Sequence, residues 1–376
     1  MIASAICIGL CQALAICETD TWKCRGKDFG WYLITIYSSA VFSYSAIYRY
    51  TNRREGSIVI LSPYAVQLLQ VLTILLFSPL LSGAIARVEA RLQGRRGPSV
   101  LQPYYDLWKL FGKESLRPRG SGFLFVAGPV VAFACYLIVP MLIPVLTTYP
   151  LPLGYMGDIL GGGFILGLGG FAVALSAAVT RSPYAQLGSS RAMSFGALGE
   201  PIVLFVVFSV SIITRTDLPY AMASTIRSSA SALVLPSHVL AAIAFFLVVL
   251  SETARIPVET HSGTIELGMI DEARSFEHSG PSMALLTWGS AMKQMILYTI
   301  LINVFLAPWG LADSGNLLAV VLAVLSLLGK AFLVGCLFAV IDNSFAKLRL
   351  FKITEYLAGS FLIAVLALLV YLVGIG

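Results

Sequence analysis

The fold is decided by the apolar run ASALVLPSHVLAAIAFFLVVLS at residues 230–251, which the charged stretch ETARIPVETHSGTIE follows directly at residues 252–266. The run is long and apolar enough for a membrane-spanning helix, which needs about 20 such residues. The charged stretch places Glu252, Arg255, Glu259 and Glu266 just beyond its end. Because a charge in a bilayer costs roughly 2.5 to 3.5 kcal/mol, packing alone does not select such residues. Their position predicts proton or ion handling.

The composition indicates an all-α polytopic membrane protein. Of the 376 residues, 58% are hydrophobic and 12% charged, and the mean hydropathy is +0.86. Eight apolar runs predict eight core transmembrane helices, the fourth of them short, within a membrane domain at residues 62–376. The runs are 62–86, 122–146, 158–179, 200–214, 230–251, 284–308, 317–341 and 356–375.

Basic residues alternate between the two sets of loops. The loop from Arg87 to Arg119 carries eight Lys or Arg, whereas the loops predicted on the opposite side carry only Arg215 and Arg227. By the positive-inside rule, the basic loops and the Glu252 loop are predicted to be cytoplasmic, in a cytoplasmic (inner) membrane. Since the net charge of +6 resides in these short loops, no nucleic-acid binding is expected.

The N-terminal extension, residues 1–61, has two short apolar segments, Met1–Cys17 and Trp31–Tyr48. They predict one or two further membrane segments, with a cleaved signal peptide as the alternative because Ala13 and Ala15 have the small-residue spacing. The six cysteines and three histidines lack the spacing of a metal site, so no metal or other cofactor is expected in this chain.

Residues 104–111 have the periodicity of an amphipathic helix, with Tyr104, Leu107, Trp108 and Phe111 on one face. This helix is either an anchor at the membrane surface or a docking floor for a cytoplasmic partner. A second local pattern, Gly163-x-x-x-Gly167, lies within an apolar run and predicts a close helix-helix contact.

Acidic residues dominate the loop at 252–280. Two carboxylates near 4 Å at an effective dielectric of 20 repel by about 4 kcal/mol, or roughly three pKa units, so that one of them can exchange protons near neutrality. The alternative is a solvated acidic loop in which Glu252 pairs with Arg255. The acidic residues are Glu252, Glu259, Glu266, Asp271, Glu272 and Glu277.

Three more ionisable residues, Glu200, Lys293 and Lys330, lie within or beside apolar runs. They predict a buried polar track along which the arrival of a proton at one group shifts the pKa of the next. For Glu200 and Lys293, placement at a helix end or snorkelling to the interface is the alternative.

A series of motifs follows in order along the chain. The motifs are Arg95-Arg-Gly-Pro98, Ser182-Pro-Tyr184, Gly188-Ser-Ser-Arg191, Glu200-Pro201, Glu252-Thr-Ala-Arg-Ile-Pro-Val-Glu259, Glu277-His-Ser-Gly-Pro281, Lys293-Gln294 and Asn343-Ser-Phe-Ala-Lys-Leu-Arg349. As a set they resemble the membrane subunit shared by respiratory complex I, where it is named subunit 1 or H, and the group 4 membrane-bound NiFe hydrogenases. The resemblance extends from about residue 62 to residue 376.

Within this family the chain is most similar to the formate hydrogenlyase and hydrogenase-4 branch. Quinone-reducing members usually have Gly-Pro-Asn-Arg and Pro-Phe-Asp, where this chain has Gly97-Pro-Ser-Val100 and Pro257-Val-Glu259. The resemblance implies a subunit that is not catalytic by itself. It docks a peripheral redox arm and couples electron transfer to proton or sodium movement.

The resemblance also implies partners: the hydrogenase large and small subunits, an iron-sulfur subunit and antiporter-like membrane subunits, with the NiFe and iron-sulfur clusters held by those partners. The docking residues it implies are Arg91, Arg95, Arg96, Asp106, Lys109 and Arg191. Those for ion coupling are Glu200, Glu252, Arg255, Glu259, Glu266, Asp271, Glu272, Glu277, Lys293 and Lys330. The alternatives are a quinone-site subunit of a complex I-type NADH dehydrogenase, an independent ion transporter and a purely structural anchor.

Overall fold

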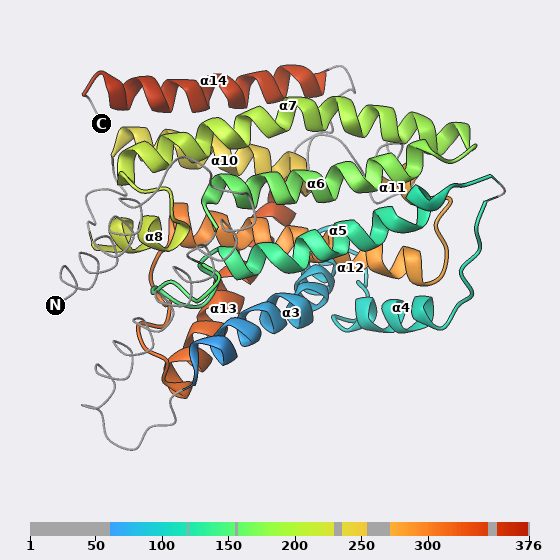
Figure 1. The fold of residues 1–376 in the computed structure, drawn as a ribbon, viewed down its shortest axis with the longest axis horizontal. Coiled ribbons are helices and arrows are strands. Elements are labelled where there is room, and N and C mark those ends of the chain that lie inside the picture. Colours follow the sequence, from blue (N-terminus) through green and yellow to red (C-terminus); the bar gives the residue numbers. More distant parts are fainter. Residues whose placement is uncertain are drawn as a thin grey trace, which may run out of the picture. The chain divides into compact units, whose positions relative to one another are not determined.

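A computed structural model describes residues 61–118, 120–154, 157–228, 235–253, 271–344 and 352–374. In these ranges the chain forms helices and no strand, which confirms the predicted all-α class (Figure 1). The predictions for residues 1–60 lie outside the described residues. The long helices are α3 (Pro63–Leu92), α5 (Phe123–Leu142), α6 (Ile159–Ala178), α7 (Pro183–Thr214), α10 (Pro236–Glu252), α12 (Pro281–Ile300), α13 (Leu317–Ser344) and α14 (Lys352–Leu372). The shorter ones are α4 (Gln102–Phe111), α8 (Pro219–Ser228), α11 (Asp271–Ser275) and the π-helix η1 (Leu301–Leu306), which continues α12.

The long helices correspond in order to the eight predicted spans. Seven of the described helices are long and apolar enough to cross a membrane, and α10 is a shorter apolar helix. The fourth span was predicted too short, because α7 begins at Pro183, where proline is favoured in the first turn, and continues through Pro201. The fifth is shorter than predicted, because Pro236 begins α10.

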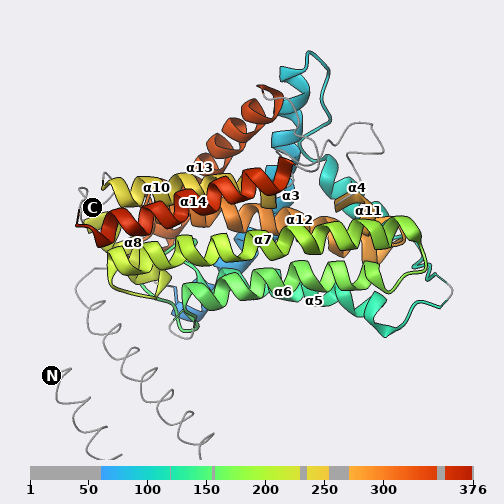
Figure 2. The same cartoon turned by 90° about the horizontal axis from the view of Figure 1, so that it is seen from above.

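The helices pack around one apolar core. In Figures 1 and 2, α5, α6 and α7 lie side by side, and α10 and α14 pack against α7. Helix α12 packs against α5 and α3, and α13 packs against α3. Aromatic rings fill the centre: Tyr298 and Phe338 have centroids 4.9 Å apart, and those of Phe245 and Phe305 are 4.8 Å apart.

Loops that are far apart in sequence meet at two opposite ends of the bundle. At one end, Leu61 donates to the carbonyl of Gly315 at 3.0 Å, and both guanidinium nitrogens of Arg227 donate to Asp313 at 2.5 and 2.8 Å. Arg227 thereby holds the pKa of the Asp313 carboxyl below its usual value. At the other end, Gln93 donates to Asn343 at 2.9 Å. This pairing of loops agrees with the alternation expected of eight crossings.

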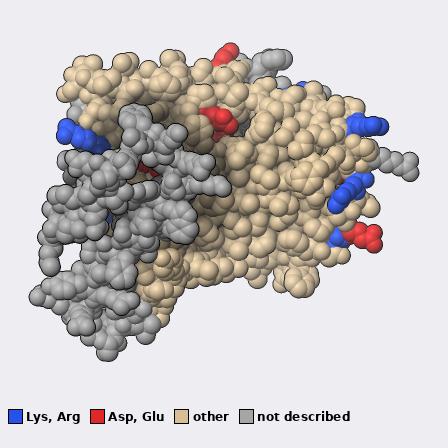
Figure 3. All heavy atoms as spheres, viewed as in Figure 1, with Lys and Arg blue, Asp and Glu red and all other residues tan. Residues whose placement is uncertain are grey.

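Lys and Arg side chains in the view of Figure 3 lie near the two ends of the described surface. Between them the visible described surface is mostly uncharged, apart from acidic side chains near its upper middle. Such a surface suits contact with lipid or with other apolar helices, because exposed charge is costly in a bilayer.

Two glycines make close contacts between helices: Gly128, and Gly167 of the predicted Gly163–Gly167 pair, where a Cβ would lie 2.9 Å from Oε1 of Glu200 in α7. A Cβ at Gly128 would lie 2.4 Å from the Cβ of Ser176 and 2.7 Å from the carbonyl oxygen of Ala172, both in α6. At Gly163 the nearest atom would be 3.9 Å away, on Val203. The sequence prediction considered glycine pairs and therefore missed Gly128, whose small partner four residues along α5 is Ala132.

We predict that Gly128→Ala lowers the free energy of unfolding by about 1 to 3 kcal/mol, because the added methyl group pushes α5 away from α6. Thermal denaturation in a mild detergent measures the effect. The control is Gly170→Ala in α6, where an added Cβ meets nothing within 4 Å. Equal midpoints for the two variants would contradict the close approach.

Candidate functional site

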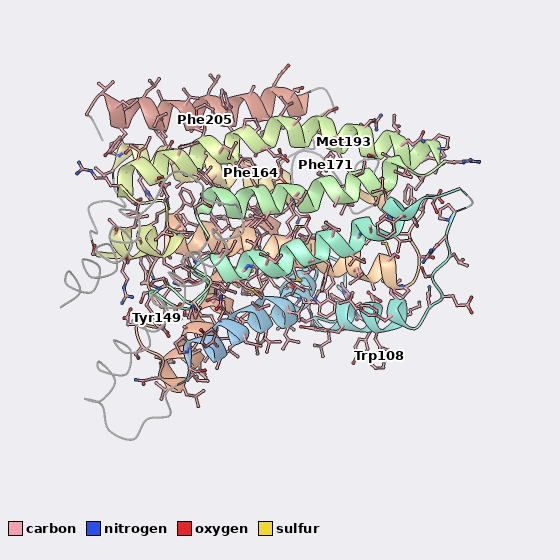
Figure 4. The ribbon with its side chains drawn as sticks, viewed as in Figure 1. Trp108, Tyr149, Phe164, Phe171, Met193 and Phe205 are labelled. Carbon is pink, nitrogen blue, oxygen red and sulfur yellow. The ribbon has the colours of Figure 1, made fainter. Side chains whose placement is uncertain are left out.

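A cavity of about 560 Å³ lies among α6, α7, α10, α11 and α12. Four charged residues from four different helices line it: Glu200, Glu252, Arg274 and Lys293. Most of the remaining wall is apolar, and Phe164, Phe171 and Met193 of this wall are labelled on α6 and α7 in Figure 4. Charges within an apolar wall interact more strongly than charges in water, since the local dielectric is lower.

An ion pair between α10 and α12 forms part of the cavity wall. The Nζ atom of Lys293 donates to Oε2 of Glu252 at 2.6 Å. Their side chains are 22% and 28% exposed, respectively, so both remain accessible from the cavity. Lys293 therefore has Glu252 as its partner in the cavity wall. The proposed pairing of Glu252 with Arg255 lies outside the described residues.

Glycines make room for the two carboxylates. A Cβ at Gly199 would lie 3.1 Å from Oε1 of Glu252, and a Cβ at Gly167 would lie 2.9 Å from Oε1 of Glu200. Glu200 lies within α7, and not at a helix end as the alternative supposed. Its carboxylate faces the cavity that contains the Glu252–Lys293 pair.

We predict that Gly199→Ala and Gly196→Ala differ in stability by about 1 kcal/mol, although both glycines lie in α7. Each substitution gains roughly 0.5 to 1 kcal/mol of helix propensity. At Gly199 the new methyl group displaces the Glu252 carboxylate, whereas at Gly196 nothing lies within 4 Å. Thermal midpoints measure the difference. Gly199→Ala as stable as Gly196→Ala would contradict the role given to this glycine.

The segment that leads into α12 is anchored to the bundle by His278. Its ring stacks on Phe125 with centroids 4.2 Å apart, and its Nε2 lies 3.3 Å from Oγ of Ser176. Burial lowers the pKa of His278 to about 4, so the ring is neutral at pH 7. Next to it, Oγ of Ser279 accepts from the amide of Leu116 at 2.8 Å. This segment fixes the start of the helix that carries Lys293.

The other predicted coupling residues are not assembled at the cavity. Glu277 is half-buried beside His278 and does not line the cavity. Lys330 bonds to the backbone carbonyls of Ala307 and Trp309, away from the cavity lining. Residues outside the described set, or described only by their backbone, are Arg255, Glu259, Glu266, Asp271 and Glu272.

Arg274 is the cavity residue that the predicted set omitted. It lies in α11, in the acidic loop, and its guanidinium lines the same wall as Glu252 and Lys293. The sequence signal that could have identified Arg274 is its basic side chain in a loop with six acidic residues. Among the described residues, no group of three or more His, Cys, Asp or Glu side chains is arranged to hold a metal ion.

The predicted docking residues lie on or near one end of the bundle. Arg91, Arg95 and Arg96 are exposed at and beyond the end of α3. Asp106 and Lys109 are exposed on α4, and Arg191 is half-buried on α7.

The apolar face predicted for residues 104–111 is divided in the structure. Leu107 is 6% exposed, whereas Trp108 is 85% exposed and points away from the bundle (Figure 4). Adjacent residues on a helix lie about 100° apart, so the packing of α4 on α3 and α12 buries one of them and not the other. Phe111 contacts Trp288 of α12, with centroids 6.3 Å apart.

Comparison with known proteins reveals similarity over most of the chain. It is 33% identical over 294 residues to formate hydrogenlyase subunit 4 of Escherichia coli K12, covering 75% of this chain and 90% of that protein. It is 29% identical over 308 residues to hydrogenase-4 component C of the same organism, covering 82% and 96%. Identity to NADH-ubiquinone oxidoreductase chain 1 of Papio hamadryas is 27% over 315 residues, covering 80% and 94%.

The fold is also known from a solved assembly. A chain in the structure of the membrane-bound sulfane sulfur reductase, an archaeal respiratory membrane complex, matches with a TM-score of 0.69 and 21% identity, covering 82% of this chain and 99% of that chain. The family model described as NADH dehydrogenase matches residues 65–373. The chain is therefore a multi-pass membrane protein that belongs to the NADH dehydrogenase subunit 1 family.

Proposed function

We propose that this chain is the membrane-anchor and ion-translocation coupling subunit of a membrane-bound NiFe hydrogenase complex of the formate hydrogenlyase type. The similarity to formate hydrogenlyase subunit 4 and hydrogenase-4 component C supports this assignment. The observation that carries the coupling role is the Glu252–Lys293 ion pair in the wall of a cavity that also contains Glu200. The coupled ion is a proton or sodium.

The cavity has two states in this proposal: one in which Glu252 is paired with Lys293, and one in which a positive charge at Glu200 weakens that pair. A neighbouring redox centre can favour one state over the other. With Lys293 bonded to it, Glu252 is held as a carboxylate. Another positive charge arriving at Glu200, on the same cavity, weakens the attraction between Glu252 and Lys293 and favours release of a cation. Electron transfer in a docked partner changes the field at this cavity and supplies the bias.

The chain acts with partners that hold the NiFe and iron-sulfur clusters, and binds no cofactor of its own. The partners are the hydrogenase large and small subunits, an iron-sulfur subunit and antiporter-like membrane subunits, in a cytoplasmic membrane. Docking takes place at the cytoplasmic end, where Arg91, Arg95 and Arg96 are exposed.

The similarity to NADH-ubiquinone oxidoreductase chain 1 favours a second candidate, a quinone-site subunit. Quinone-dependent activity of the purified assembly would support that candidate.

We predict that Arg95→Glu combined with Arg96→Glu removes the peripheral redox subunits from the assembly, because reversed charge repels an acidic docking surface. Mild-detergent purification on a tag of this chain, followed by identification of the co-purifying chains, measures the loss. The control is Arg215→Glu, an exposed arginine beyond α7 that the loop contacts place at the opposite end. Retention of the redox subunits by the double variant would contradict docking at this surface.

A further inference from the structure

Helix α12 does not end in a regular last turn. It continues as the π-helix η1, which ends at Leu306, and Ala307, Trp309 and Gly310 follow in non-helical backbone. The wide π-turn closes with the amide of Ala307 bonded to the carbonyl of Ile302 at 2.6 Å. Carbonyl oxygens beyond a helix end lack intrahelical partners and carry partial negative charge. This unwound stretch therefore presents backbone oxygens that need a positive or hydrogen-bonding partner.

The partner is the ammonium group of Lys330 from α13. Its Nζ donates to the carbonyl of Ala307 at 3.0 Å and to the carbonyl of Trp309. The same Nζ lies 5.7 Å from the centroid of the Trp309 ring, within the range of a cation–π contact. The neighbouring carbonyl of Gly310 accepts from Oγ of Ser326 at 2.6 Å, which fixes this non-helical segment against α13.

Among the described residues, no carboxylate forms an ion pair with Lys330. The ion pairs found among the described residues join Arg227 to Asp313 and Lys293 to Glu252, and Lys330 belongs to neither. Its helix is otherwise apolar from Leu317 to Ile341. A charge in such a helix is costly, so the carbonyl oxygens and the ring are its compensation. These are the groups that bind monovalent cations, whereas divalent cations prefer carboxylate oxygens.

We infer that the unwound segment from Ala307 to Gly310 is a binding site for one monovalent cation of the ammonium class, and that Lys330 fills this site with its own amine. The carbonyls of Ala307 and Trp309 and the Trp309 ring recognise the cation. Unwound backbone next to a helix end binds cations in membrane transporters by the same chemistry. The site is separate from the cavity that contains Glu252, and the inference does not rest on the proposed function.

The competing explanation is that Lys330 is only a cap for the carbonyl end of α12 and η1, with no site that accepts a free ion. The two explanations differ once the amine is removed. Lys330→Ala leaves space and free carbonyls, whereas Lys330→Met leaves the carbonyls but fills the space. If the segment is a binding site, Lys330→Ala binds methylammonium and Lys330→Met does not. If Lys330 is only a cap, neither variant binds it.

The experiment measures the thermal midpoint of the purified full-length chain in methylammonium chloride and in tetramethylammonium chloride at equal ionic strength. Methylammonium is expected to raise the midpoint of Lys330→Ala by about 3 °C relative to the bulkier ion. Lys330→Met and the native chain are expected to show no such difference. Adding Trp309→Leu to Lys330→Ala is expected to reduce the gain, because the ring no longer contacts the cation.

Two results would overturn the inference: no specific gain in Lys330→Ala, or an equal gain in the native chain and Lys330→Met. If Lys330→Ala does not fold without added cation, its yield is compared after purification with methylammonium or tetramethylammonium throughout. Recovery with methylammonium alone supports the site. Lys330→Ser is a second variant without the amine, and its yield is compared in the same two salts. If neither variant gives folded protein in either salt, the carbonyls accept no free cation and the inference is overturned.

Discussion

Lys293→Met is expected to lower the free energy of unfolding by about 2 to 4 kcal/mol, the largest stability loss predicted for a single side chain here. The substitution keeps an apolar stem of similar length but removes the ammonium that bonds to Glu252 at 2.6 Å. The carboxylate then remains in an apolar wall without that partner, and the desolvation cost is no longer offset. Thermal or denaturant unfolding in a mild detergent measures the loss.

A double-mutant cycle separates the ion pair from the packing. Glu252→Gln combined with Lys293→Met removes both charges, and most of the lost stability is expected to return. Arg227→Met is the matched single control, because the Arg227–Asp313 pair is more exposed, at 37% and 63%, and exposed pairs contribute only about 0.2 to 1 kcal/mol. Additive effects of the two cavity substitutions would show that Glu252 and Lys293 do not act together.

Glu252→Gln is expected to stop ion movement while the complex still assembles and transfers electrons. The amide has nearly the same shape as the carboxylate but cannot hold the charge that the proposed function requires at this point of the cavity. Ion uptake into inverted membrane vesicles during redox turnover measures the effect, and a fall of roughly tenfold or more is expected. The control is Glu355→Gln, an exposed carboxylate in the first turn of α14. Loss of uptake in the control would assign the effect to general damage.

Sequence patterns were sufficient for the fold because apolar length and charge alternation are local properties. Runs of about 20 apolar residues predicted the long helices in their order along the chain. The limits of the fourth and fifth spans were wrong, because the less apolar stretch at residues 183–199 belongs to α7 and Pro236 sets the start of α10. Proline position and burial decide such limits, and apolar length does not reveal them.

The candidate site was only partly predictable from the sequence. Charged residues in apolar runs pointed to Glu200, Glu252 and Lys293, because membrane charges are costly and therefore informative. Their pairing depends on how α10 faces α12, which no local pattern specifies, so the partner of Glu252 was missed. The same limit applies to Lys330, which the sequence placed on the predicted polar track. Its partners are the backbone carbonyls of Ala307 and Trp309, and a carbonyl group gives no residue-specific signal in the sequence.

The number of ions moved per electron pair in the reconstituted complex tests the coupling claim most directly, when the native chain and Glu252→Gln are compared. The proposed coupling predicts a ratio close to zero for Glu252→Gln, with electron transfer within about twofold of the native rate. An unchanged ratio at an unchanged rate would contradict it, because the carboxylate beside Lys293 would then take no part in moving the ion.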